Sequence, residues 1–281
     1  MSSDELTGLT VVVTAERRAA DFVAILERHG AAVVHTPAIH VLPLTADEDL
    51  RVATASIIAD PPELFVASTA MGFRGWLEVA DEWGMREELI SVLDGVRIIT
   101  RGPKAKGAVR GVGLREEWSP ETESFEEVLS RLTAEGVDGK SIAVQHHGTI
   151  TEWEPLTDLA AGLSALGAEV REFSVYRWTR PQDQLPMREL VDSIVHGRVD
   201  AVTFTSAPAV ASLLSTAKDM VRVAEVIAAF SGPVTPFCVG SVTASPLEAL
   251  GVPTLQPPRA RLGSLARFVI EELPRRGGVE G

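Results

Sequence analysis

The 281-residue sequence is poor in cysteine and contains no long apolar run. Its single cysteine, Cys238, excludes an intrachain disulfide and any metal site built from several thiolates. The apolar neighbours of Cys238 in TPFCVG favour a buried strand residue over a nucleophile. No run reaches 18 apolar residues, and the N-terminal MSSDELTGLT lacks the basic and apolar regions of a secretory signal. We therefore expect a cytoplasmic protein with no membrane contact and no bound metal.

Positive charge is also scarce. The chain has 26 Lys and Arg residues against 39 Asp and Glu residues, which gives a net charge of −13. Such an excess of negative charge repels nucleic acid and does not attract an anionic ligand from a distance. We expect no nucleic-acid binding by this chain, and an anionic ligand would have to be held by local groups. The charge is compatible with a monomer, which is the state we expect.

The sequence does contain an alternation of short apolar runs with amphipathic stretches. At 45% apolar residues, the chain is long enough to form two cores. The alternation is typical of βαβ units, in which helices cover both faces of a parallel sheet in three layers. Extended segments are expected at 31–39 and 168–178. Strands are expected at 10–14, 64–68, 96–100, 141–145, 201–206 and 235–240, and helices at 17–29, 72–83, 104–111, 122–135, 153–166, 187–196, 207–217, 219–230, 243–250 and 262–273.

Four landmarks recur in the two halves of the chain at almost fixed spacing. Each set consists of a glycine that ends a helix, a serine after a strand, a glycine in a loop and a further glycine. Successive landmarks are separated by 38, 34 and 11 residues in the first half and by 39, 34 and 11 residues in the second. This agreement indicates an internal duplication. The landmarks are Gly30, Ser68, Gly102 and Gly113, and then Gly167, Ser206, Gly240 and Gly251.

The repeated serines and loop glycines follow predicted strands. In parallel α/β units such loops lead into helix N-termini, whose unsatisfied N–H groups bind anions. Small residues there would let a ligand approach the backbone. Each serine taken alone is more simply interpreted as a helix cap, whereas the matched set at the strand ends favours ligand binding. Cations near two of these loops suggest a basic rim, with a solvated helix face as the alternative. They are Arg17, Arg18, Arg101, Lys104, Lys106 and Arg110.

Familiar catalytic and nucleotide-binding motifs are not present. Glu116 occupies the third glycine position of a dinucleotide fingerprint, and Ala108 stands where a P-loop requires lysine. The pair His146 and His147 has no HExxH context, and no GxSxG elbow exists. We therefore expect no cofactor. Tyr176, the sole tyrosine, is either a hydrogen-bond donor in a cleft or a packed residue with its hydroxyl at the surface.

Four segments together resemble the uroporphyrinogen-III synthase family, over Thr10 to about Ile270. They are VVVTAERRAADFVAILERHGAAVVHTPAI, GAEVREFSVYRW, DAVTFTSAPAVASLL and CVGSVTASPLEALGV. The resemblance implies an α/β fold of two parallel-sheet domains, joined by two extended connectors near 37–43 and 173–178, with a cleft between them. The first domain would comprise 1–38 and 177–281, the second 41–173, and 274–281 would be a flexible tail.

The resemblance also implies a reaction in tetrapyrrole and heme biosynthesis. The substrate would be hydroxymethylbilane, a linear tetrapyrrole with eight carboxylates. Without a cofactor, it is closed to uroporphyrinogen III with loss of water and inversion of the terminal pyrrole ring. The implied catalytic residues are Tyr176, Thr243 and Ser206. The substrate-binding candidates are Thr14, Arg17, Ser68, Thr69, Ala70, Gly102, Lys104, Gly148, Ala207, Gly240 and Ser241.

Three departures from the family pattern leave an alternative open. Thr14 is followed by Ala15 and Glu16, so the arginine that commonly comes next is displaced to Arg17. Ala70 stands where an asparagine is usual, and QHHGTITEW is unlike the family's ordinary sequence. Related domains in some bacteria continue into a DNA-binding regulatory domain. The alternative function is therefore a tetrapyrrole-binding module of a regulator without turnover, and a generic two-domain binding protein is a third.

Overall fold

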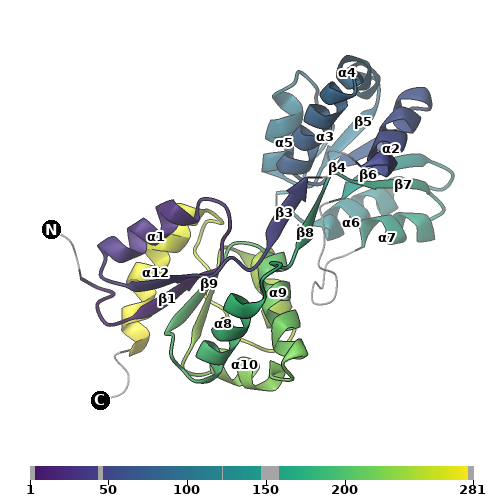
Figure 1. Ribbon diagram of the computed structural model, residues 1–281. Helices are drawn as coiled ribbons and strands as arrows, with labels where there is room; N and C mark the ends of the chain where they lie inside the picture. The colour runs from purple at the N-terminus through teal and green to yellow at the C-terminus, as the bar shows by residue number, and fades with distance from the viewer. Residues whose placement is uncertain (1–3, 44–46, 122, 147–157, 278–281) are drawn as a thin grey trace. The chain divides into compact units, whose positions relative to one another are not determined.

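The computed structural model describes residues 4–43, 47–121, 123–146 and 158–277 (Figure 1). The chain divides into two compact units. Unit 1 contains the described residues up to His40 together with those from Trp178 onward. Unit 2 contains the described residues between Val41 and Arg177. The chain therefore begins in unit 1, forms unit 2 and returns to complete unit 1.

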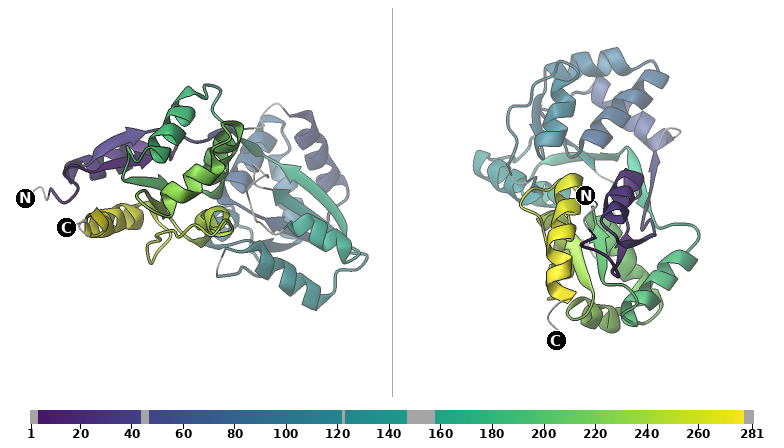
Figure 2. Two further views of the ribbon diagram at one scale, coloured as in Figure 1. Left: turned by 90° about the horizontal axis from the view of Figure 1, so that it is seen from below. Right: turned by 90° about the vertical axis from the view of Figure 1, so that its left-hand side faces the viewer.

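Unit 1 is built on a four-stranded parallel sheet. The strand order is β10 (Thr235–Cys238), β9 (Ala201–Phe204), β1 (Thr10–Val13) and β2 (Ala32–His35). Val11 and Val13 pack with α1 (Ala19–Arg28) and α12 (Leu262–Gly277), whereas Val12 packs on the opposite face. Figure 2 shows α1 and α12 side by side. The opposite face is covered by α8 (Leu185–Val195), α9 (Ala207–Asp219), α10 (Val223–Phe230) and α11 (Ser241–Glu248).

Unit 2 repeats this three-layer design. Its parallel sheet has the order β5 (Arg97–Thr100), β4 (Leu64–Ala67), β6 (Ser141–His146) and β7 (Glu169–Ser174). One face packs on α6 (Phe125–Glu135) and α7 (Leu159–Ala165). On the other face, Phe65 packs against Phe73 and Trp76. The helices belonging to that layer are α2 (Glu48–Ala59), α3 (Ala70–Glu82), α4 (Arg86–Asp94) and α5 (Pro103–Arg110).

The internal repeat is confirmed by the sheet topology. The strands of the first half, β1, β2, β4 and β5, correspond to β6, β7, β9 and β10 of the second half. Replacing each strand by its counterpart turns the order β10-β9-β1-β2 into β5-β4-β6-β7, which is the order of the other sheet. Each unit therefore takes two strands from each half. This interchange explains why the repeats follow chain order while the compact units do not.

The landmark glycines adopt the same backbone conformation in both halves. The helix-ending pair has φ of 92° and 87°, and the last pair has φ of 90° and 75°, all in the region that favours glycine. The loop pair is extended and caps α5 and α11. These pairs are Gly30 with Gly167, Gly113 with Gly251, and Gly102 with Gly240.

The predicted pairing of Ser68 with Ser206 is off by one residue. The residue that caps α3 is Thr69, and the residue at the N-cap position of α9 is Ser206. Thr69 follows Gly30 by 39 residues, the same interval that separates Ser206 from Gly167. Thr69 and Ser206 are therefore the structural counterparts, and Ser68 corresponds to Thr205.

The two units are linked by extended chain. β3 (His40–Pro43) and β8 (Tyr176–Thr179) pair in a two-stranded sheet. They occupy corresponding positions in the two halves, so the connectors are also repeat counterparts. At the other end of unit 1, α12 continues through Pro274 to Gly277, four residues into the segment expected to be a flexible tail.

Two helices were not predicted. α2 (EDLRVATASIIA) carries β-branched and hydroxyl residues that have low helix propensity. It forms because Asp47 caps its first turn and because Leu50, Thr54 and Ile57 are buried on one face. α4 is short and strongly charged, and only Leu89 and Leu93 anchor it in the core. Tertiary packing therefore outweighs weak local signals in both helices.

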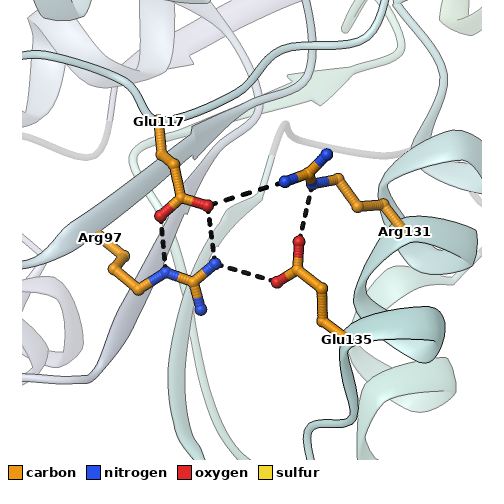
Figure 3. Close-up of polar contacts among 4 residues, drawn as sticks. All are labelled: Arg97, Glu117, Arg131 and Glu135. Carbon is orange, nitrogen blue, oxygen red and sulfur yellow. Dashed lines mark hydrogen bonds and ion pairs between the residues drawn. The ribbon is translucent and has the colours of Figure 1, made fainter.

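Charged side chains stabilise the amino end of the unit 2 sheet. Arg97, the first residue of β5, contacts Glu117 at 2.7 Å and Glu135 at 2.9 Å (Figure 3). Arg131 closes the ring by pairing with Glu135 at 2.8 Å, and its guanidinium lies 5.0 Å from the Trp118 ring centroid. Hydrogen bonds from Arg97 lower the pKa of Glu117. This network lies at the end of the sheet opposite the loops that follow the strands.

Cys238 is a strand residue, as predicted. It lies in β10 and is fully buried. Burial raises the pKa of its thiol, which keeps the group protonated and unreactive at neutral pH. Across the described ranges, none of the helices is both long and apolar enough to cross a membrane.

Candidate functional site

Tyr176 is held at the carboxyl end of the unit 2 sheet. Its side chain is buried, with a residue exposure of 3%, and its Oη lies 3.2 Å from Thr69 Oγ1. Thr69 caps α3, and its Oγ1 accepts a hydrogen bond of 3.0 Å from the Gly72 amide. With its oxygen engaged in this way, Thr69 can direct its own proton to Tyr176. The structure thus brings together Tyr176 and Thr69, two residues that the sequence placed 107 positions apart.

Gln145 belongs to the same cluster and was missed by sequence reasoning. It lies near the end of β6, next to β4, and is completely buried. Its Nε2 donates to Ser68 Oγ at 3.2 Å and to the His146 carbonyl at 2.7 Å. Ser68 is 2% exposed. The available signal was a polar residue at the carboxyl end of the apolar run SIAV, level with the serine loop after β4.

The loop at Gly102 is filled by the protein's own side chain. A Cβ at Gly102 would lie 2.5 Å from Glu123 Cγ, so glycine is required here by Glu123. Lys104 is exposed, and its Nζ lies 3.6 Å from the same carboxylate. Ala70 is the first residue of α3 and is nearly buried. Of these three candidates, Lys104 is the one that reaches solvent.

The predicted basic rim is largely neutralised within unit 2. Lys106 and Arg110 bind Glu116 at 3.0 and 2.6 Å, and the Glu116 side chain is only 3% exposed. Arg101 lies over the Phe125 ring, with 5.0 Å between its guanidinium carbon and the centroid. These three cations therefore form neither an open basic rim nor a simply solvated helix face, because each contacts a side chain of unit 2. Burial tends to raise the pKa of Glu116, but hydrogen bonds from Arg110 and Lys106 outweigh it and lower the pKa to about 2.

Glu116 should make unit 2 acid-sensitive. Its folded pKa of about 2 lies below the ordinary value of 4.5, so its stabilising contribution is complete above pH 4.5 and is lost as the pH falls toward 2. Between pH 7 and pH 3 the wild type should lose about 2 kcal/mol more unfolding free energy than Glu116→Gln. Urea unfolding of both proteins at the two pH values measures the difference. Parallel losses would show that the carboxylate is not stabilised as the ion pairs indicate.

A second set of candidates lies at the carboxyl edge of the unit 1 sheet. Thr14 follows β1, is buried and donates from Oγ1 to the Thr203 carbonyl at 2.7 Å, so its hydroxyl serves the sheet. Ser206 is half-buried and makes no side-chain capping bond to α9. The other members of the set are buried Ala207 and Thr243, half-buried Gly240, and exposed Ser241 and Arg17. Gly148 lies outside the described residues.

A pocket of about 250 Å³ lies beside β7 and the start of α2. Three carboxylates line it, from Asp47, Asp49 and Glu172, against one arginine, Arg177. His146 Nε2 contacts Glu172 at 2.6 Å. Because its lining is mainly acidic, this pocket does not suit a ligand that carries several carboxylates.

The fold and site define a class: a two-unit α/β protein with interchanged halves, whose sheet edges carry hydroxyl and amide groups. The family Uroporphyrinogen-III synthase HemD matches residues 20–267 of the chain. The chain belongs to this family, and its fold and membership place it in tetrapyrrole biosynthesis.

Solved structures share this fold, and one curated relative, an uncharacterized protein, matches over most of the chain. A mutant uroporphyrinogen III synthase from the extremely thermophilic bacterium Thermus thermophilus matches with a TM-score of 0.81 and 25% identity, covering 96% of this chain and all of that one. Uroporphyrinogen-III synthetase from Helicobacter pylori 26695 has a TM-score of 0.51 at 13% identity, covers 94% of this chain and 99% of that one, and supports the fold alone. Bacillus subtilis (strain 168) protein YjjA is 26% identical over 92% of this chain and 94% of its own length.

Proposed function

We propose that the protein closes hydroxymethylbilane to uroporphyrinogen III, with loss of one water and inversion of the terminal pyrrole ring. Family membership supports the reaction class. The observation that carries the proposal is the hydrogen-bonded chain from the Gly72 amide through Thr69 to Tyr176. We further expect a cytoplasmic monomer that requires no cofactor.

The chain of hydrogen bonds suits departure of a hydroxyl group. Gly72 N–H donates to Thr69, Thr69 donates to Tyr176, and the Tyr176 hydroxyl donates to the substrate's hydroxyl. The C–O bond breaks as the adjacent pyrrole supplies the electron pair, and the oxygen takes the Tyr176 proton and leaves as water. Ring closure forms the new C–C bond and releases one proton from the attacking pyrrole, which restores the Tyr176 hydroxyl. A linear series of donors strengthens each successive bond, so a neutral hydroxyl at the end becomes a better donor. No stronger acid is needed.

Control of the product requires positioning more than acid strength. The enzyme must hold the bilane so that closure without inversion is excluded. Backbone amides at the helix N-termini and nearby hydroxyls suit the eight substrate carboxylates. We assign this role to the candidate loop residues, and we retain Thr243 and Ser206 of unit 1 as catalytic candidates. Thr14 and Gly102 would contribute through the backbone conformation of their loops.

Turnover distinguishes this function from binding alone. We expect protein at one hundredth of the hydroxymethylbilane concentration to consume all of the substrate faster than spontaneous closure does. A tetrapyrrole-binding module would instead protect about one equivalent from closure and consume none. The measurement is the loss of linear bilane with time at both catalytic and stoichiometric protein concentrations. Heat-unfolded protein gives the spontaneous rate.

A further inference from the structure

We infer that Gln145 is a positioning residue, which fixes the loop carrying Ser68 and Thr69 and thereby the hydroxyl of Tyr176. The structural part of this inference stands on hydrogen bonds and burial in unit 2. Its catalytic consequence rests on the proposed function. Gln145 itself would not contact the reacting atoms.

The orientation of the Gln145 amide is determined by its surroundings. The His146 carbonyl can only accept a hydrogen bond, so the atom 2.7 Å from it must be the amide nitrogen. The same nitrogen donates to Ser68 Oγ at 3.2 Å. Ser68 is therefore an acceptor toward Gln145 and keeps its own proton for another partner. One buried amide thus fixes both the position and the polarity of the first residue after β4.

The amide oxygen of Gln145 argues against a purely structural role for this residue. Gln145 Oε1 is buried and accepts no hydrogen bond from the described part of the chain. Leaving a buried acceptor unpaired costs about 1–3 kcal/mol, which an apolar residue at the same strand position would avoid. What glutamine adds is the donor to Ser68.

Gly72 couples the amide to the tyrosine. A Cβ at Gly72 would overlap Gln145 Nε2 and would lie 2.9 Å from Thr69 Oγ1. Gln145 and Thr69 therefore share the space that the missing side chain leaves open. Thr69 Oγ1 in turn lies 3.2 Å from Tyr176 Oη. A shift of the Gln145 amide should reach Tyr176 through Ser68 and Thr69.

Tyr176 is the only tyrosine in the chain, which makes the inference directly measurable. Protein labelled at the tyrosine ζ-carbon with ¹³C should give one NMR signal, whose shift reports the hydrogen bonding of the hydroxyl. We expect Gln145→Met, a substitution of similar volume, to move this signal in the same direction as Thr69→Val. Gln256→Met in unit 1 is the matched control and should leave it in place.

The kinetic readout separates positioning from simple destabilisation. We expect Gln145→Met to lower kcat about tenfold with KM changed less than about twofold, because only the loop that carries Ser68 and Thr69 shifts while the other candidate loops still hold the substrate. Gly72→Ala should also lower kcat, because its Cβ would displace both the Gln145 amide and Thr69 Oγ1, and it replaces Gln145→Met if that variant does not fold. An unmoved tyrosine signal in a folded Gln145 or Gly72 variant overturns the inference. If the tyrosine signal moves in the variants but the wild type shows no turnover, the inference is retained and the proposed function is rejected.

Discussion

Tyr176→Phe should lower kcat for uroporphyrinogen III formation by about 100-fold, within the range that a positioned proton donor contributes. The phenylalanine ring fills the same buried space, and Thr69 keeps its bond from the Gly72 amide. The free energy of unfolding should therefore fall by only about 1 kcal/mol, the value of one hydrogen bond. A large loss of rate with a small loss of stability is the expected combination.

The measurement is the initial rate of product formation at saturating substrate, with urea unfolding of the same samples. Thr69→Ser is the matched control, because serine keeps a hydroxyl at the cap of α3 and should retain most of the rate. Thr69→Val removes that hydroxyl, and its rate of product formation should lie between those of Thr69→Ser and Tyr176→Phe. Unchanged kcat in Tyr176→Phe would remove the tyrosine from the mechanism.

Trp76→Ala should have the largest effect on stability, about 4 kcal/mol. Trp76 on α3 is completely buried. Its ring centroid lies 5.4 Å from that of Phe65 and 4.5 Å from that of Phe173, so it joins the helix to both β4 and β7. Its Nε1 also donates to Thr54 Oγ1 at 2.8 Å. Truncation removes the aromatic contacts, leaves a cavity and frees α2 from α3.

Urea unfolding followed by circular dichroism tests this prediction. Trp83→Ala is the control, because Trp83 is only half-buried at the C-terminal end of the same helix and should cost less than half as much. Trp76→Phe keeps most of the ring volume but loses the bond to Thr54, and should lie between the two alanine variants. Equal losses in both alanine variants would show that the aromatic cluster is not the principal support of α3.

The six strands expected from the sequence, β1, β4, β5, β6, β9 and β10, were predictable because each is a short apolar run in a parallel sheet that helices cover on both faces. The repeat was predictable because its glycines are required by backbone conformation, as at Gly30 and Gly167. Helix α2 was not predictable, because its residues have low helix propensity. The helix is stabilised instead by the cap at Asp47 and by burial of Thr54. The interchange of halves between units was implied by family resemblance and not by the periodicity.

The site was less predictable than the fold. Resemblance singled out Tyr176, and the loop after a predicted strand singled out Thr69, but neither gave a reason for their contact, which depends on β8 passing beside the cap of α3. Sequence could not distinguish a basic rim from paired cations, because the approach of Glu116 to Lys106 and Arg110 exists only in the folded chain. Gln145 was overlooked because a glutamine ending an apolar strand usually marks the strand's exit to solvent.

The most direct test of the synthase assignment is the isomer composition of the product. Freshly generated hydroxymethylbilane is incubated with the purified full chain, and the uroporphyrinogens are oxidised and resolved by chromatography. We predict that isomer III predominates over isomer I, the product of spontaneous closure. Isomer I alone, from a sample shown to be folded, would contradict the assignment and leave a tetrapyrrole-binding protein without turnover.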